Sequence, residues 1–157
     1  MYKFFAIIIF LTLITFTTSF PLSGFTQCAG TFPNEVTSFS FSPNPIIAGQ
    51  NVTYTVSIDN TETVQNGATF NITTYKQQQL MFNVVSDYCK DLVEASGYGC
   101  PLEPGNYTFV FSAYMMTTPY DPKNTTIEFN SRAEIANPGD PKTILTCIER
   151  KYSVYYP

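Results

Sequence analysis

Apolar and polar side chains alternate along most of the chain, a pattern that predicts β-strands with one buried face. Residues 50–59 show it most clearly, because the even positions from Val52 to Ile58 are apolar and the odd positions are polar. Further strands are predicted over 68–73, 106–113 and 124–135, with weaker ones over 36–41, 80–85 and 144–154. Only residues 88–95 suggest a helix, of one turn at most.

Glycine and proline separate these strands, for example at Pro104-Gly105 and over 137–141. Seven or eight short strands with one apolar face predict an all-β protein, an immunoglobulin-like antiparallel β-sandwich. The chain has 157 residues, which suits one domain, and we expect it to span 21–157.

The first twenty residues have the pattern of a signal peptide. Lys3 precedes an apolar run over 4–16, and small residues follow at 17–19. A membrane-spanning helix needs about 20 apolar residues, so this run is too short for an anchor. We therefore expect residues 1–20 to be cleaved and the product to be secreted or to reside in the lumen of the secretory or endolysosomal system.

Four cysteines, Cys28, Cys89, Cys100 and Cys147, fit an oxidised domain with two disulfides. Counting leaves all three connectivities open. Four Asn-x-Thr sequons begin at Asn51, Asn71, Asn106 and Asn124, each on the polar face of its predicted strand. A glycan must lie in solvent, so the sequons and the alternation agree about which face is exposed.

Composition excludes several classes of function. The chain has no His, and no Cys-x-x-Cys pair is present, so we expect no metal site and no cofactor. A net charge of −4 argues against nucleic-acid binding. Carboxylates occur at Asp87, Asp91, Glu94 and Glu103, but nothing in the sequence pairs any two across a cleft. We expect no enzymatic activity.

Aromatic residues are unusually frequent on the predicted inward faces. Residues 21–157 contain nine Phe and ten Tyr. These rings either fill an ordinary core between two sheets or line a slot for an apolar ligand. Composition alone does not separate the two interpretations.

Several segments resemble a known family. Residues 41–45 with Gly49, residues 87–89 with 96–102, and residues 145–148 are similar in order and spacing to the motifs of the ML lipid-recognition family. The similarity is closest to the phosphatidylglycerol/phosphatidylinositol transfer proteins and more distant to the Niemann-Pick type C cholesterol carriers.

The resemblance implies a sandwich that holds a lipid in a cavity between its sheets, with disulfides Cys28–Cys147 and Cys89–Cys100. The cholesterol carriers have a third cysteine pair near the first turn, which this chain lacks, so a phospholipid is favoured over a sterol as ligand. We expect a monomeric carrier that contacts membranes transiently. The rival interpretation is a secreted immunoglobulin-like adhesion module with a filled core. The residues expected to line the cavity are Tyr54, Val56, Ile58, Phe70, Ile72, Phe82, Phe109, Phe111, Ile127 and Phe129.

Overall fold

The computed structural model describes residues 24–157, so the expected signal peptide over 1–20 lies outside the described residues. Strands make up most of the described chain. They are β1 (Thr26–Gln27), β2 (Glu35–Ser42), β3 (Ile46–Ile47), β4 (Asn51–Asn60), β5 (Thr69–Lys76), β6 (Gln79–Asp87), β7 (Gly105–Tyr114), β8 (Thr125–Asn137) and β9 (Thr143–Tyr156). Seven of them have eight residues or more, and β1 and β3 have two each.

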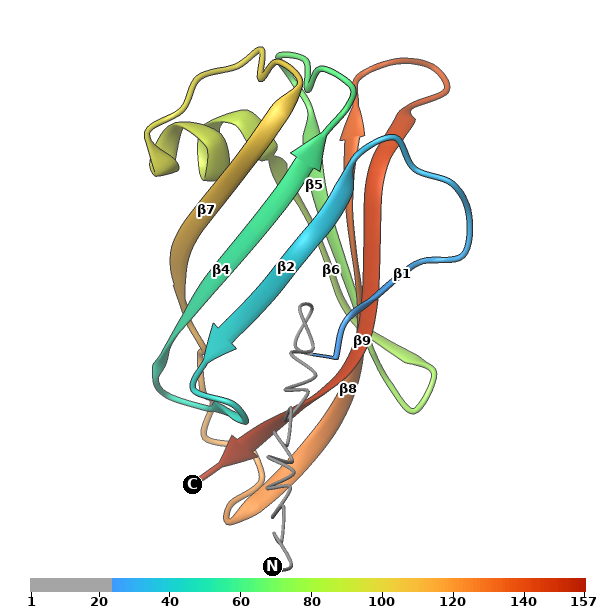
Figure 1. Ribbon diagram of the computed structural model, residues 1–157. Helices are drawn as coiled ribbons and strands as arrows, with labels where there is room; N and C mark the ends of the chain where they lie inside the picture. Colours follow the sequence, from blue (N-terminus) through green and yellow to red (C-terminus); the bar gives the residue numbers. More distant parts are fainter. Residues whose placement is uncertain (1–23) are drawn as a thin grey trace, which may run out of the picture.

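The strands form two sheets that pack face to face (Figure 1). The larger sheet has the order β1-β9-β8-β5-β6, with β3 paired to β9, and the smaller has the order β2-β4-β7. All neighbours are antiparallel except β3 and β9. The expected all-β antiparallel sandwich is therefore confirmed.

The helical segment is longer than the single turn expected from the sequence. Residues Cys89–Val93 form a π-helix (η1), and Glu94–Ser96 continue it as a 3₁₀ turn (η2). The segment buries Leu92 and Val93 under one end of the sandwich. An eight-residue segment shows too little apolar periodicity to be separated from a loop by pattern alone.

The buried side chains gather in two clusters at opposite ends of the slot between the sheets. One is built around Tyr88, Val93, Phe109 and Leu145, next to the helical segment. The other is smaller and contains Phe41, Ile46, Ala48, Val52, Phe129 and Val154. Phe25 and Phe39 are only partly buried and pack against both clusters. These two rings thus connect the two clusters.

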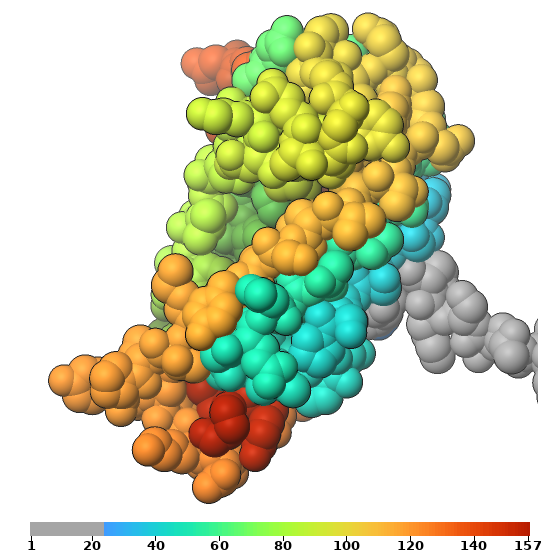
Figure 2. Space-filling view, turned by 90° about the vertical axis from the view of Figure 1, so that its left-hand side faces the viewer, coloured from blue at the N-terminus to red at the C-terminus, as the bar shows by residue number. Residues whose placement is uncertain are grey.

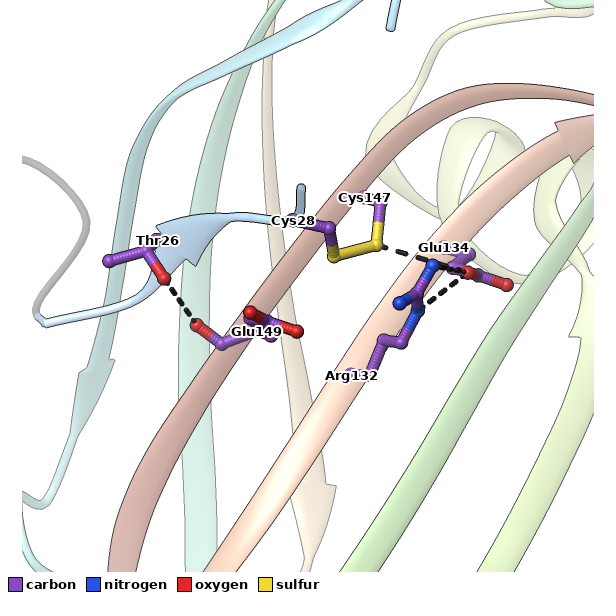
Figure 3. The surroundings of a disulfide bond; sticks show 6 residues. All are labelled: Thr26, Cys28, Arg132, Glu134, Cys147 and Glu149. Atoms are coloured by element: carbon purple, nitrogen blue, oxygen red, sulfur yellow. Dashed lines mark hydrogen bonds and ion pairs between the residues drawn. A yellow bond between two sulfur atoms is a disulfide. The ribbon is translucent and has the colours of Figure 1, made fainter. Parts of the chain in front are cut away.

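Two disulfides are present, Cys28–Cys147 and Cys89–Cys100, the pairing that the family resemblance implied. The first holds the segment after β1 against β9, on the outer side of the larger sheet (Figure 3). Beside it Arg132 and Glu134 of β8 form an ion pair of 2.6 Å (Figure 3). The second joins two cysteines that are 11 positions apart in the sequence and ties η1 to the segment that leads into β7.

Candidate functional site

An apolar cavity lies between the two sheets. Its volume is about 210 Å³, and strands of both sheets contribute its walls. None of the described residues that line it carries a charge. They are Phe25, Phe39, Phe41, Ile46, Tyr54, Phe70, Ile72, Thr74, Phe82, Phe111, Ala113, Met115, Ser131, Ala133, Ile148 and Tyr152.

A second, smaller cavity of about 40 Å³ lies nearer the helical segment, against Tyr88 and Leu92. Its lining residues are Val36, Phe39, Val56, Ile58, Phe70, Tyr88, Leu92, Phe109, Phe111, Ala133, Ile135, Thr146 and Ile148. Five residues line both cavities and so form the partition between them: Phe39, Phe70, Phe111, Ala133 and Ile148. The two cavities thus share a wall, and we refer to them together as the slot.

The slot faces the edge where β6 and β7 flank it. These strands end their respective sheets, so main-chain hydrogen bonds do not close the gap between them. Phe82 of β6 lines the larger cavity and is still 45% exposed. Figure 2 views this side, where the surface is recessed between the light-green β6 and the orange β7, below the helical segment. The β6–β7 edge is therefore the mouth of the slot.

The structure places eight of the ten expected lining residues on a cavity wall. Tyr54, Ile72 and Phe82 line the larger cavity, Val56, Ile58 and Phe109 line the smaller, and Phe70 and Phe111 line both. The other two face inward but lie elsewhere. Phe129 is buried in the smaller core cluster and stacks on Tyr152 at 5.7 Å between ring centroids, while Ile127 packs at its border.

Hydroxyl groups form a polar cluster inside the otherwise apolar larger cavity. Thr74 of β5 and Ser131 of β8 are register partners and share a hydrogen bond between their hydroxyls. Burial raises the pKa of the Tyr152 phenol on β9, and hydrogen bonds with Ser131 and Thr74 partly offset this rise. From the opposite sheet Tyr54 contributes a phenol whose pKa is raised to about 12, mainly by burial and further by Tyr152. All four groups are therefore uncharged near neutral pH.

The alternation pattern contains a signal for this cluster, which was not among the expected lining residues apart from Tyr54. Thr74 continues the inward series Phe70 and Ile72, and Ser131 falls between Phe129 and Ala133 on the inward face of β8. A polar residue at an inward position breaks the apolar series, and such a break needs a structural or functional reason.

On the opposite edge of the sandwich, a cation closes the gap between β9 and β2. The Arg150 guanidinium lies 5.4 Å from the ring centroids of both Phe25 and Phe41. Burial lowers its pKa, and its Nε donates to the carbonyl of Lys151 at 2.6 Å. Because this edge is covered by rings and a cation, the mouth between β6 and β7 is the more accessible side.

The sequon asparagines lie outside the slot. Asn51, Asn106 and Asn124 are exposed, and Asn71 is half-buried on β5. Residues 24–157 contain no helix long and apolar enough to cross a membrane. Within the same range, no cluster of three or more His, Cys, Asp or Glu side chains is arranged to hold a metal ion.

An antiparallel sandwich with an uncharged cavity between its sheets has the architecture of a binding domain for apolar ligands. Comparison with known families makes this specific, because the family model of the ML domain matches residues 23–154. The chain belongs to the ML family, a family of lipid-binding domains. No curated protein matches this sequence.

A solved structure agrees on the fold. The chain is similar to a crystal structure of a Niemann-Pick type C2 protein from Japanese carpenter ant, with a TM-score of 0.58 and 17% sequence identity. That similarity covers 85% of this chain and 98% of the ant protein. A weaker similarity, with a TM-score of 0.49 and 8% identity, is to the C-terminal domain of wzt, covering 82% and 75% of the two chains.

Proposed function

We propose that residues 21–157 form a secreted or lumenal carrier that holds one lipid between its two sheets and transfers it between membranes. A phospholipid is the first candidate ligand and a sterol the second. The observation that carries the proposal is the uncharged 210 Å³ cavity, which lies between two packed core clusters and faces the mouth between β6 and β7.

Hydrophobic burial supplies the driving force for binding. Each methylene transferred from water into the slot contributes about 0.8 kcal/mol before the entropy costs of association. Ten buried methylenes would therefore supply on the order of 8 kcal/mol, which places the gross affinity in the micromolar range. Such a site retains a lipid during diffusion yet releases it at a membrane.

The cavity must widen to take a whole lipid chain, because sites for small molecules usually measure about 300–1,000 Å³. The mouth provides a route for this movement. No main-chain hydrogen bonds of a sheet join β6 to β7, whereas separating neighbours within a sheet would break such bonds. The ring contact between Tyr54 and Phe111, with centroids 5.0 Å apart, lies on the wall that must move.

A charged headgroup belongs outside the slot in this proposal. The described lining residues include no Lys or Arg that could neutralise a buried phosphate, and an unpaired buried charge is very costly. The acyl portion would therefore occupy the slot while the phosphate stays at the mouth in water.

Membrane contact is proposed for the apolar rim of the mouth, which we define as the exposed apolar residues of β6 and of the segment from Tyr114 to Tyr120. On β6, Leu80, Met81, Val84 and Val85 are each about half exposed. Across the mouth, Met116 is 80% exposed and Tyr120 95% exposed. Because residues 21–157 carry a net charge of −5, this contact depends on apolar burial rather than on attraction to anionic lipids.

The decisive experiment is native mass spectrometry of the protein purified from a eukaryotic secretion system. We expect a stoichiometric adduct, and solvent extraction will identify it as a lipid. The same spectra report glycan occupancy of the four sequons and the position of signal-peptide cleavage. A protein without an adduct that also takes up neither fluorescent phospholipid nor fluorescent sterol would overturn the carrier function. That result would favour the adhesion module with a filled core.

A further inference from the structure

The hydroxyl cluster inside the larger cavity has no role in simple hydrophobic binding. We propose that Tyr54, Thr74, Ser131 and Tyr152 form a subsite that recognises a neutral hydroxyl group on the bound lipid. This inference rests on the proposed lipid-carrier function and narrows it, because it selects among lipids by the polar group that enters the slot.

The position of the cluster is set by the sheet register. Thr74 and Ser131 are direct partners on β5 and β8, and Tyr152 on β9 is a diagonal neighbour of Ser131 on the same face. Three adjacent strands thus direct hydroxyls into the cavity from one sheet. Tyr54 approaches from β4 of the other sheet and lines the same cavity. A ligand atom between the sheets would therefore meet hydroxyls from both sides.

Hydrogen-bond capacity favours a ligand hydroxyl over other polar groups. A hydroxyl supplies one donor and two acceptor sites, so the hydrogen bond that Thr74 and Ser131 share leaves acceptor sites free on both hydroxyls. The Tyr54 phenol makes no hydrogen bond to any other described side chain or main-chain atom. It is thus free to donate to the ligand oxygen, while the hydroxyl oxygens of Thr74 and Ser131 can accept a hydrogen bond from the ligand hydroxyl.

Charge excludes the competing classes of ligand from this subsite. A carboxylate or phosphate only accepts hydrogen bonds and would bring a negative charge into a cavity whose described lining includes no Lys or Arg. Arg150, the register partner of Ser131, is not among the lining residues, and its guanidinium lies against the Phe25 and Phe41 rings. A plain hydrocarbon would leave the free capacity of the cluster unused. A neutral alcohol can form hydrogen bonds with the cluster and brings no charge into the cavity.

The volume of the cavity adds a constraint on shape. At about 210 Å³ it exceeds the roughly 150 Å³ cavity that admits a benzene ring in another protein, and room for a second acyl chain requires the widening at the mouth. The partition leads on to a further 40 Å³. A slender, single-chain alcohol is therefore the simplest probe of the subsite.

The test compares 1-dodecanol, dodecane and dodecanoate as competitors of a fluorescent single-chain lipid at pH 7.5. A purely apolar cavity would favour dodecane, since burying a hydroxyl without a partner is unfavourable. With the subsite present, we expect the alcohol to bind at least about tenfold more tightly than the alkane or the carboxylate. Equal binding of alcohol and alkane, or tighter binding of dodecanoate, would overturn the subsite.

Variants assign the preference to the cluster. Thr74→Val combined with Ser131→Ala removes two hydroxyls at nearly constant shape, and should reduce the preference for the alcohol to about threefold or less. Ile72→Val is the matched control, because Ile72 lines the same cavity on the same strand and carries no hydroxyl. It should weaken both ligands equally and keep the tenfold preference.

A folding check accompanies each variant by circular dichroism and thermal unfolding. If the double variant does not fold, Tyr152→Phe removes one hydroxyl while it keeps the ring that stacks on Phe129. A preference that survives in a folded variant would refute the assignment to these residues. Failure of the wild type to bind the fluorescent lipid at all would instead overturn the carrier function together with the subsite.

Discussion

Ala133 is the position where a larger side chain would compete most directly with a bound lipid for the space of the cavity. It is a small residue on the inward face of β8, and it belongs to the partition that lines both cavities. Ala133→Leu adds three carbon atoms to the slot. At about 0.8 kcal/mol per buried carbon group, they contribute at most about 2.4 kcal/mol, from which about 0.5–1 kcal/mol of rotamer entropy is lost.

We therefore expect Ala133→Leu to raise the free energy of unfolding of the lipid-free protein by about 1–2 kcal/mol. Thermal unfolding should show this as an increase in Tm of about 3–6 °C for a domain of this size. Lipid affinity should fall in the same variant, because the added side chain occupies the space of the ligand. Stability and binding would thus change in opposite directions.

Ala68→Leu is the matched control, since Ala68 is fully buried in the larger core cluster and lines neither cavity. Overfilling a packed core costs about 1–3 kcal/mol, so this variant should unfold at a lower temperature. If Ala133→Leu is destabilised as much as Ala68→Leu and binds lipid as the wild type does, the space around Ala133 is not a functional cavity and the reasoning is refuted.

Three further predictions address the slot, the tyrosines and a buried amide. Phe70→Arg should abolish lipid retention in a folded, secreted protein, whereas Val110→Arg on the exposed side of β7 should retain it; an unfolded Phe70 variant would mark that ring as core. The free energy of unfolding should fall as pH rises from 10 towards 12, because the pKa of tyrosine is near 10 in the unfolded chain and the pKa of Tyr54 is about 12 in the folded protein. Equal free energies from urea unfolding at pH 9 and pH 11 would contradict this. Asn34→Ala should lower the free energy of unfolding by about 2–4 kcal/mol. The reason is that the amide oxygen accepts hydrogen bonds from the main-chain N–H groups of Thr61 and Glu62, and the amide nitrogen donates to the Glu62 carbonyl. A loss below about 0.5 kcal/mol in urea unfolding would contradict this.

Strands with a clean alternation were predictable to within a few residues. The predicted strand over 50–59 corresponds to β4 over Asn51–Asn60, and the inward positions of β4 are those that alternation assigned. The pattern is reliable there because β4 is the central strand of its sheet, so one face meets the core and the other meets water.

Strand β6 shows where the pattern fails. Its residues Leu80, Met81, Phe82, Val84 and Val85 form a nearly continuous apolar run, which usually indicates a strand buried on both faces. In the structure they are exposed, because β6 is an edge strand that lies beside the mouth rather than under the smaller sheet. The sequence contains the apolar run but not its position at an edge, which depends on the whole topology.

The candidate site was also predictable only in part. Alternation identifies which side chains point between the sheets, and eight of the ten chosen residues do line a cavity. It does not show how far apart the sheets stand at each residue. Phe129 and Ile127 face inward where β8 and β9 meet the short β3, so they are packed in the smaller cluster instead of facing free space.

The open edge between β6 and β7 has a consequence for the range of ligand lengths that one protein can carry. A pocket closed on all sides sets an upper limit on the ligand, because any atom beyond its floor has no place. Here the slot runs alongside an edge where no hydrogen-bonded strand blocks the way. A chain longer than the slot can leave sideways past Phe82 and rest against the exposed Val84. We expect affinity to rise with chain length and then level off, without a sharp cut-off.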